Sequence, residues 1–599
     1  MSIESLFTPP AVVRDARDDG SFILRSPHPL APYPQSLGIL LERWARERPD
    51  RIFLAERAGE SWRTITFAQM YAAVRRVASG LLDMGLTRET PIAILSPASL
   101  AHATVSFAAL YVGIPVAPIS PAYSTQFGDV RRLRFVLETL QPRMVFADDA
   151  AVYATALDAV NSAVPIVIAH GSLRGRELCT LAQFGARDGS ERVDTAHANV
   201  GPDHIAKILF TSGSTGEPKG VINTHRMLCS NQQSIAQVWP FLAKHDLVLV
   251  DWLPWHHTFG GNNNVNMTLF HGGTLYIDDG RPIPGQVERS IAAVSEHPPT
   301  VYFNVPRGHK LIVEALCADP QFAASFFSRL RLIGNAGAAL PKSTWNALRD
   351  LADRFGAGNV AVTGSWGLTE TAPAATAVHY PLRDPADVGL PLPGAELLFV
   401  PFEQKHEVWV RGPLVTPGYW RRDDLTARAM NDEGFYRTGD ALRLADPADP
   451  SQGILFDGRL AENFKLSSGT WVDAGAVRLA VLASAATLVD DVVVAGENHD
   501  EIGLLFFVSG TMQSASADQC ALRIALADVL DAYNTSAGGS SFRIGRAIVV
   551  FAPLSAADGE ITDKGSVNQR RVLQRRTGIV AQLFADDPAA DVIILRNGA

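Results

Sequence analysis

A cluster of hydroxyl residues, glycines and one lysine stands out at Phe210–Gly220, where the sequence reads FTSGSTGEPKG. Glycines let backbone N–H groups curl around an anion, while hydroxyls and an ammonium add further donors. The stretch departs from the phosphate loop G-x-x-x-x-G-K-[ST], because Lys219 follows a proline and precedes Gly220, which has no hydroxyl for Mg²⁺. It therefore predicts either another kind of phosphate loop or a solvated turn. The apolar run IAKILF before it indicates a strand and favours the phosphate site.

Carboxylates stand close to glycines in two later stretches. The segment GSWGLTETAP places Thr369 and Glu370 beside Gly367, and a carboxylate near a phosphate loop suits Mg²⁺, which prefers oxygen ligands and phosphates. The segment FYRTGD ends in Asp440, whose carboxylate could accept hydrogen bonds from ribose hydroxyls. Each carboxylate also has a non-functional interpretation: Glu370 could be a solvated residue of a loop, and Asp440 could be a residue of a turn.

Two further stretches carry groups that could take part in proton or charge chemistry. The segment WLPWHHTFGG, which contains His256 and His257, follows an expected strand; its alternative is a core loop with satisfied imidazoles. The segment GEITDKGSVNQRRVL places Lys564 in a polar turn before a basic helix; its alternative is an ordinary surface lysine.

The elements that must position these residues alternate between short apolar strands and helical patterns. Such alternation predicts α/β layers, with ligands at the carboxyl ends of the strands. After Pro381 the sequence is rich in turn residues between short strand-like runs, which predicts a smaller β subdomain. A compact α+β unit of about 140 residues is predicted to begin near Gly458. We expect a large N-terminal part at residues 1–458, a C-terminal lid at 459–599 and a hinge within 456–465. The expected strands of the large part include 142–148, 163–170, 204–210, 247–254, 273–278, 300–306 and 331–337.

Composition narrows the class of protein. A chain of 599 residues is too long for one core, and 47% hydrophobic and 19% charged residues are typical of an ordered globular protein. The net charge of −9 shows no excess of basic residues of the kind that nucleic-acid-binding proteins use to contact phosphates. The four cysteines are far apart and have no metal-ligand spacing, which indicates unpaired thiols in a reducing compartment. The start of the chain lacks a basic-then-apolar signal, so we expect a cytoplasmic protein.

One stretch raises a membrane alternative, because residues 91–128 contain no Asp, Glu, Lys or Arg. A spanning helix needs about 20 apolar residues, whereas prolines divide this stretch into shorter pieces. The pieces PIAIL, SLAHATVSFAALYVG and IPVAPI predict a strand, a buried helix and a second strand. We therefore expect a buried βαβ unit and no membrane span.

The order and spacing of the motifs are more specific than any one of them. Together TSGSTGEPKG, GLTE, TGD, GR and a late lysine resemble the adenylate-forming superfamily, which comprises acyl-CoA synthetases with luciferase and peptide-synthetase relatives. The resemblance covers nearly the whole chain. The segments VTPGYW, PTVYFNVPRG and FKLSSGTWV look most similar to the feruloyl-CoA synthetase branch.

The resemblance implies an α/β fold in which two α/β subdomains and a β subdomain form the N-terminal part, followed by a small mobile α+β C-terminal domain. It implies an acid–CoA ligase that uses ATP, Mg²⁺ and coenzyme A, with an aromatic acid such as ferulate as the substrate. The alternatives are another aryl or medium-chain acid, an acyl-AMP ligase that serves a separate carrier protein, and a non-catalytic nucleotide sensor. The oligomeric state is left open, with a homodimer as one alternative.

The resemblance also implies a role for each matching residue. Glu370 would hold Mg²⁺, His257 would border the carboxylate pocket, and Lys564 would bridge the attacking carboxylate and the α-phosphate, where its compact ammonium offsets negative charge. The β- and γ-phosphates would lie against Thr211, Ser212, Gly213, Ser214, Thr215, Gly216 and Lys219. The rest of the nucleotide would contact Ala336, Gly337 and Ala338 on one side of adenine, Trp366 and Gly367 on the other, Thr369 at a phosphate, and Asp440 and Arg459 at the ribose.

The sequence differs from the wider pattern at several positions. The hinge position carries Ala461 instead of Asp or Lys, and the late lysine stands in TDKGSVNQR instead of G-K-I-x-R. In the acid pocket His256 replaces an expected Asn, while Gly334 and Asn335 replace aromatic residues. We expect Gly334 to leave a space and the pocket to favour an acid with polar ring substituents, or with a bulkier tail, over plain cinnamate or benzoate.

Overall fold

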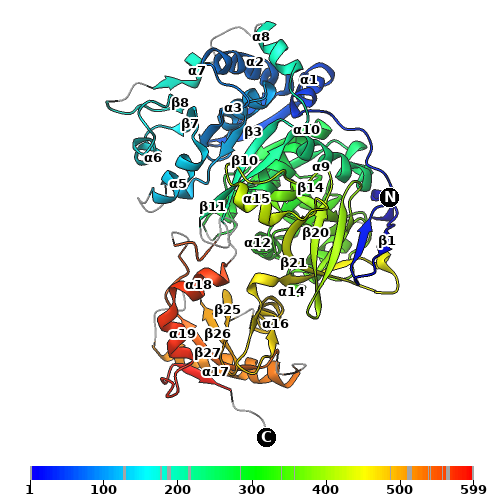
Figure 1. The fold of residues 1–599 in the computed structure, drawn as a ribbon, viewed down its shortest axis with the longest axis vertical. Helices are drawn as coiled ribbons and strands as arrows, with labels where there is room; N and C mark the ends of the chain where they lie inside the picture. The colour runs from blue at the N-terminus through cyan, green and yellow to red at the C-terminus, as the bar shows by residue number, and fades with distance from the viewer. Residues whose placement is uncertain are drawn as a thin grey trace.

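The computed structural model describes residues 3–125, 130–175, 178–184, 191–212, 217–283, 285–338, 340–356, 358–485, 488–508, 516–536, 539, 541–555, 558–561 and 567–595. These residues form an α/β structure with several sheets and a separate C-terminal sheet at one end of the molecule (Figure 1). The fold predicted from the sequence is confirmed.

The phosphate-loop motif belongs to a seven-stranded sheet in the described residues, with strand order β11-β10-β6-β5-β7-β8-β9. All neighbours are parallel except β10 and β11, which are antiparallel. The predicted βαβ unit is present as β5, helix α3 (Leu100–Tyr111) and β6. The strands are β5 (Ile92–Leu95), β6 (Val116–Pro118), β7 (Met144–Asp149), β8 (Ile166–His170), β9 (Cys179–Thr180), β10 (Ile205–Ser212) and β11 (Pro218–Thr224).

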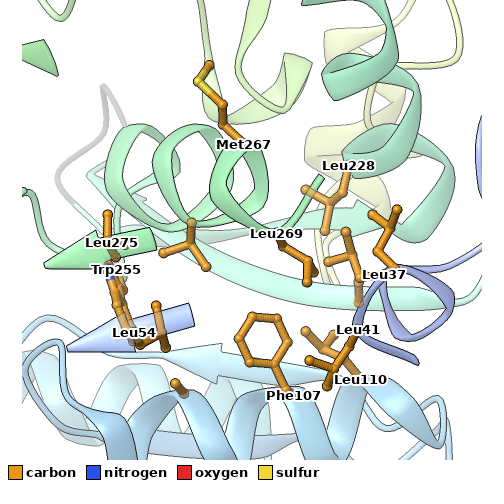
Figure 2. Packing of buried hydrophobic residues seen from close by; sticks show 14 of the residues in the cluster. Leu37, Leu41, Leu54, Phe107, Leu110, Leu228, Trp255, Met267, Leu269 and Leu275 are labelled. Atoms are coloured by element: carbon orange, nitrogen blue, oxygen red, sulfur yellow. The ribbon is translucent and has the colours of Figure 1, made fainter. Parts of the chain in front are cut away.

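A four-stranded sheet packs beside it, in the order β12-β13-β3-β4. Its strands are β3 (Ile52–Ala58), β4 (Ser61–Thr66), β12 (Val248–Asp251) and β13 (Thr274–Ile277). The principal core lies between these layers and contains Phe107 and Leu110 of α3, Leu54 of β3 and Leu275 of β13 (Figure 2). Burial on both sides explains why α3 has no charged residue.

The largest sheet of the described residues has eleven strands, in the order β1-β2-β19-β20-β21-β22-β18-β17-β16-β15-β14. The predicted β subdomain is therefore continuous in hydrogen bonding with the parallel strands β14, β15 and β16, and an N-terminal hairpin extends its far edge. The strands are β1 (Val13–Ala16), β2 (Phe22–Arg25), β14 (Val301–Asn304), β15 (Leu332–Asn335), β16 (Ala361–Gly367), β17 (Ala374–Ala377), β18 (Asp387–Pro391), β19 (Glu396–Phe402), β20 (Lys405–Arg411), β21 (Tyr436–Leu444) and β22 (Ile454–Arg459).

Helices cover the sheets of the large part. The α-helices are α1 (Leu37–Glu47), α2 (Phe67–Asp83), α4 (Ala122–Thr125), α5 (Arg131–Leu140), α6 (Ala154–Asp158), α7 (Leu181–Phe184), α8 (Glu191–Ala198), α9 (His225–Val238), α10 (Val265–His271), α11 (Val287–Glu296), α12 (Pro306–Ala318), α13 (Pro320–Phe327), α14 (Lys342–Phe355) and α15 (Asp423–Ala429). Short 3₁₀ helices are η1 (Ile3–Leu6), η2 (Pro240–Ala243), η4 (Thr369–Thr371), η5 (Pro450–Gln452) and η6 (Leu460–Glu462), and η3 (Phe259–Asn264) is a π-helix.

The C-terminal sheet has the order β25-β26-β27-β28 and its own hydrophobic core. Its strands are β25 (Asp491–Ala495), β26 (Ile502–Phe507), β27 (Ile544–Val550) and β28 (Val592–Ile594), preceded by the short pair β23 (Phe464–Lys465) and β24 (Trp471–Val472). Helices α16 (Ala474–Ala485), α17 (Ser516–Ser536), α18 (Gln569–Arg575) and α19 (Thr577–Leu583) accompany it. The domain boundary at 458/459 stays a prediction.

No helix in the described part of the chain combines the length and apolar character that a membrane crossing requires.

Candidate active site

The phosphate-loop motif connects two antiparallel strands. Thr211 at the end of β10 pairs with Lys219 at the start of β11, so the motif is a hairpin and not the strand-to-helix turn of G-x-x-x-x-G-K-[ST] loops. Ser212 ends β10, whereas Gly213, Ser214, Thr215 and Gly216 lie outside the described residues. The Thr211 hydroxyl is buried and has no hydrogen-bond partner among the described residues. Such a group suits a ligand oxygen.

Lys219 contacts the carboxylate that the sequence assigns to Mg²⁺. Its Nζ lies 3.0 Å from Glu370 Oε1 and donates to the Tyr419 hydroxyl at 2.6 Å. Tyr419 in turn donates to Glu370 Oε1 at 2.9 Å, and its hydroxyl lies 3.1 Å from that of Tyr436. Burial alone would lower the pKa of Lys219, but the charge of Glu370 and the Tyr419 hydroxyl outweigh it and raise that pKa. The structure therefore brings the predicted phosphate and metal groups together.

The loop that carries Glu370 has a conformation that requires glycine at its start. A Cβ on Gly367 would lie 1.8 Å from the Pro373 carbonyl oxygen, far inside van der Waals contact. Asn223 donates to the Thr369 carbonyl at 3.0 Å and so ties this loop to the end of β11. These contacts hold Thr369 and Glu370 beside the hairpin of Lys219.

Glu370 is suited to a magnesium ion that arrives with a nucleotide. Its side chain is 7% exposed, and Mg²⁺ usually keeps several waters and is bound through one or two carboxylates plus substrate phosphates. The described residues contain no group of three or more His, Cys, Asp or Glu that could hold a metal ion by themselves. A single carboxylate next to a lysine that is predicted to bind phosphate fits this mode of binding.

Asp440 lies in a second cluster, formed by three strands of the large sheet, β16, β21 and β22. Its Oδ2 accepts a hydrogen bond from Trp366 Nε1 at 2.9 Å, and its Oδ1 lies 3.4 Å from Arg459 Nε. Asp440 and Arg459 are register partners in β21 and β22. Burial raises the pKa of Asp440, while Arg459 and Trp366 act in the opposite direction and the charge of Glu370 raises it further. Tyr436, whose hydroxyl lies 3.1 Å from that of Tyr419, belongs to the same strand β21 as Asp440, so the two clusters adjoin.

Trp366 lies mostly in the core of the large sheet, with 6% of the residue exposed. Its indole N–H is used by Asp440, so the ring is held rigidly at the end of β16. Stacking of this ring on adenine stays a prediction.

The segment Ala336–Ala338 follows the carboxyl end of β15, next to the parallel strands β14 and β16. Gly337 has a φ of 89° and is exposed, as is Ala338, whereas Ala336 is half-buried. Asn335 Nδ2 donates to the Ala338 carbonyl at 2.9 Å and shapes the turn. An exposed backbone at the end of a parallel strand is where α/β sheets bind ligands.

The expectation of an empty space beside Gly334 is wrong. Phe303 of β14 is the register partner of Gly334, and a Cβ built on Gly334 would lie 2.3 Å from the Phe303 ring. The ring occupies the volume that a side chain at position 334 would need, so the glycine accommodates an aromatic residue from the neighbouring strand. Asn335 agrees better with the expectation of a polar group that could bind the acid. Its Oδ1 is buried and has no hydrogen-bond partner among the described residues.

His257 lies in the turn between β12 and the π-helix η3. Its ring Nδ1 accepts from the backbone N–H of Phe259 at 3.2 Å, and its carbonyl accepts from Gly261 at 2.8 Å. One turn further on, Asn262 donates to Thr258 at 3.1 Å and to Asn223 at 2.7 Å. Asn223 thus links the His257 turn to the Glu370 loop, and π-helices are frequent at functional sites.

Lys564 lies outside the described residues, so the structure does not test its role. The flanking segments are anchored on both sides. Arg576 forms an ion pair with the buried Glu560 at 2.7 Å, and Ile561 pairs with Val567. A Cβ on Gly559 would lie 2.8 Å from an Arg132 nitrogen of α5, so this end of the C-terminal part contacts the large part.

Tyr419 and Tyr436 were not identified as candidates from the sequence. Both are buried and contact the Lys219–Glu370 pair directly or through each other. Of their segments, VTPGYW marks the family resemblance and FYRTGD indicates Asp440, but neither points to its tyrosine. A buried tyrosine gives no sequence signal that separates a polar contact from core packing.

Comparison with known families is decisive here. Residues 41–420 match the AMP-binding enzyme family, and residues 462–587 match the AMP-binding enzyme C-terminal domain. The chain belongs to the AMP-binding enzymes. It is therefore an adenylate-forming enzyme, of the class that uses ATP to activate an acid.

The relatives of this AMP-binding enzyme are named for different activities. A feruloyl-CoA synthase of Amycolatopsis sp is 28% identical, with 68% of this chain and 76% of that protein covered. A long-chain-fatty-acid–CoA ligase of Yersinia pestis is 27% identical, with 63% and 70% covered. The probable non-canonical nonribosomal peptide synthetase CymA of Salinispora arenicola is 26% identical over 80% of this chain, which spans only 6% of that protein.

Solved structures support the fold of this AMP-binding enzyme. The anthranilate CoA ligase AuaEII in complex with anthranoyl-AMP superposes with a TM-score of 0.71 over 92% of this chain and 99% of that one. The sequence identity is 18%, so the likeness concerns the fold alone.

Proposed function

We propose that this protein is an ATP-dependent acid–CoA ligase that forms an acyl-AMP intermediate. The observation that carries the proposal is the adjacency of two clusters, Lys219 with Glu370 and Asp440 with Arg459, which Tyr419 and Tyr436 connect. The first has the chemistry for a triphosphate with its metal, and the second has the chemistry for a ribose. A nucleotide spanning both would present its α-phosphorus between them.

The reaction would take place in two half-steps. The carboxylate of the acid attacks the α-phosphorus of ATP and releases pyrophosphate, and the thiol of coenzyme A then displaces AMP from the acyl carbon. Thr211 and Lys219 would orient the β- and γ-phosphates, and Lys564 would offset the charge that grows at the α-phosphate. Glu370 would hold Mg²⁺, which would neutralise phosphate charge. The protein thus acts by positioning and charge stabilisation.

The acid is proposed to be aromatic, with a hydroxycinnamate such as ferulate preferred. Similarity to feruloyl-CoA synthases supports an aromatic acid. The unpartnered Oδ1 of Asn335, next to the segment assigned to the nucleotide, supports a substrate that brings a hydrogen-bond donor. A buried acceptor without a partner costs about 1–3 kcal/mol, so a donor on the acid would be favoured.

Two other substrate assignments have specific support. Similarity to a long-chain-fatty-acid–CoA ligase supports an aliphatic acid at the same site. Similarity to an L-proline–[L-prolyl-carrier protein] ligase of Streptomyces coelicolor supports transfer of the acyl group to a carrier protein instead of coenzyme A.

A panel of acids separates these alternatives. Ferulate, 4-coumarate, cinnamate, benzoate, octanoate and palmitate are each incubated with ATP and Mg²⁺, with and without coenzyme A, and AMP and thioester are quantified. The proposal expects thioester from the hydroxycinnamates. AMP formation without any thioester, together with acyl transfer to a carrier protein, would favour the carrier alternative. Release of neither AMP nor pyrophosphate with any acid would refute a ligase.

A further inference from the structure

The Lys219–Glu370 pair poses a physical problem for the proposed function, on which this inference rests. Lys219 must contact phosphates and Glu370 must contact a metal ion, yet the Lys219 ammonium lies 3.0 Å from Glu370 Oε1. If Lys219 turns to the triphosphate, a buried carboxylate loses a charged partner. An ionised carboxylate that is buried without hydrogen bonds is costly, so Glu370 needs another donor.

Tyr419 supplies a donor to this carboxylate. Its hydroxyl donates to Glu370 Oε1 at 2.9 Å while it accepts from Lys219 at 2.6 Å. Only 4% of Tyr419 is exposed, so solvent cannot easily replace the hydroxyl. A phenol carries its proton at neutral pH and is therefore able to donate.

The backbone of Tyr419 is fixed to the strand that carries Lys219. Tyr419 forms a bridge with Val221 of β11, and its neighbour Trp420 donates to the Gly220 carbonyl at 2.8 Å. The Tyr419 N–H also donates to Thr426 Oγ1 at 2.9 Å. The phenol is thus held in one position, whereas the long side chain of Lys219 can rotate about several bonds.

We propose that Tyr419 is a positioning residue for adenylation: its hydroxyl keeps Glu370 oriented for the metal ion when Lys219 turns to the phosphates. The hydroxyl is a neutral partner for Lys219, which the lysine can exchange for phosphate oxygens. Tyr419 touches neither substrate in this scheme and acts through Glu370 and Lys219.

The test is the binding of nucleotides to Tyr419→Phe without any acid substrate. Calorimetry with α,β-methylene-ATP, whose α–β bond cannot be cleaved to release pyrophosphate, measures the triphosphate in the presence of Mg²⁺. Calorimetry with AMP measures the nucleoside part, which does not need Glu370. Loss of one hydrogen bond to a charged group weakens binding by roughly tenfold or more. We therefore expect at least about a tenfold higher Kd for the Mg²⁺-bound analogue and an unchanged Kd for AMP.

Tyr380→Phe is a matched control in the same sheet region. The Tyr380 hydroxyl donates to the buried Asp387 at 2.9 Å, so the substitution removes a comparable tyrosine–carboxylate hydrogen bond outside the two clusters. Both Kd values should equal those of the wild type. A second readout is the Mg²⁺ concentration for half-maximal acid-dependent pyrophosphate exchange, which should rise in Tyr419→Phe while the KM for the acid stays constant.

Two results would overturn the proposal. One is unchanged binding of the Mg²⁺-bound analogue by Tyr419→Phe, and the other is an equal loss for the analogue and for AMP, which would indicate a general disturbance of the site. Failure of the proposed function is distinguishable, because the wild type would then bind neither nucleotide or would activate no acid. A wrong choice of acid leaves the calorimetry unaffected.

Discussion

Substitution of Asp440 provides a quantitative test of the ribose cluster. Asp440→Ala removes the acceptor for Trp366 Nε1, a hydrogen bond of 2.9 Å, and the partner of Arg459. A carboxylate that accepts from ribose hydroxyls makes charge-assisted hydrogen bonds of about 1.5–3 kcal/mol. Their loss should raise the Kd for ATP and AMP alike by roughly 10- to 150-fold.

The same substitution should affect stability by a different amount. The Trp366 N–H is left buried without a partner, which costs about 1–3 kcal/mol. Removal of a buried carboxylate relieves an unfavourable desolvation, the effect that raises the pKa of Asp440. The two contributions oppose each other, so we expect a net loss near 1 kcal/mol, at the lower end of this range.

Asp440→Asn separates binding from stability, since its amide oxygen can still accept from Trp366. Isothermal calorimetry gives the Kd values, and chemical denaturation gives the free energies of unfolding. We expect near wild-type stability for Asp440→Asn with most of the loss of nucleotide affinity. Wild-type ATP affinity in both variants would remove Asp440 from the site, and an AMP affinity that survives in Asp440→Ala would place the carboxylate away from the ribose.

Other predictions concern the late lysine, the Glu370 loop, a buried acid and the acid pocket. Lys564→Ala should abolish acyl-AMP formation but spare thioester formation from supplied acyl-AMP; equal loss of both half-reactions would contradict this role. Gly367→Ala, whose Cβ would lie 1.8 Å from the Pro373 carbonyl, should lower stability by about 1–3 kcal/mol and impair pyrophosphate exchange, while Gly201→Ala, with open space around it, should do neither. Asp251 has a pKa raised by burial from 3.8 to about 7, above its unfolded value, so its contribution to stability is complete at low pH and is lost as the pH rises to about 7. Between pH 5 and pH 8 the free energy of unfolding of the wild type should therefore fall relative to that of Asp251→Asn. If the difference between the two free energies is the same at both pH values, the raised pKa is refuted. In the acid panel, kcat/KM for ferulate and 4-coumarate should exceed that for cinnamate, and a faster reaction of cinnamate would refute the polar-pocket argument.

The strands and the principal motifs could be predicted because their signals are local. The apolar run before Thr211 gave β10, and the prolines at 91–128 correctly favoured a βαβ unit over a membrane helix. The chemistry of Glu370 and Asp440 could be inferred from a carboxylate close to a glycine, supported by the spacing of the other motifs. The location of both in adjoining clusters agrees with that inference, while their roles remain predictions.

Contacts between distant segments could not be predicted from local patterns. The pairing of β14 with β15 places Phe303 opposite Gly334, and only this register explains why a glycine there leaves no space. The contact of Tyr419 with Lys219 and Glu370 joins three segments that are far apart in the sequence. The N-terminal hairpin of β1 and β2 extends a sheet whose other strands begin near residue 301. In each case the partner is specified by the tertiary arrangement and not by neighbouring residues.

The formation of an acyl-AMP intermediate is tested most directly by oxygen transfer. Ferulate with ¹⁸O in its carboxylate is incubated with the enzyme, ATP, Mg²⁺ and coenzyme A, and the released nucleotide is analysed by mass spectrometry. Attack of the carboxylate on the α-phosphorus leaves one carboxylate oxygen on phosphorus when the thiol displaces AMP. We therefore predict AMP that carries one ¹⁸O atom. AMP without ¹⁸O, or release of ADP instead of AMP, would contradict the proposed reaction.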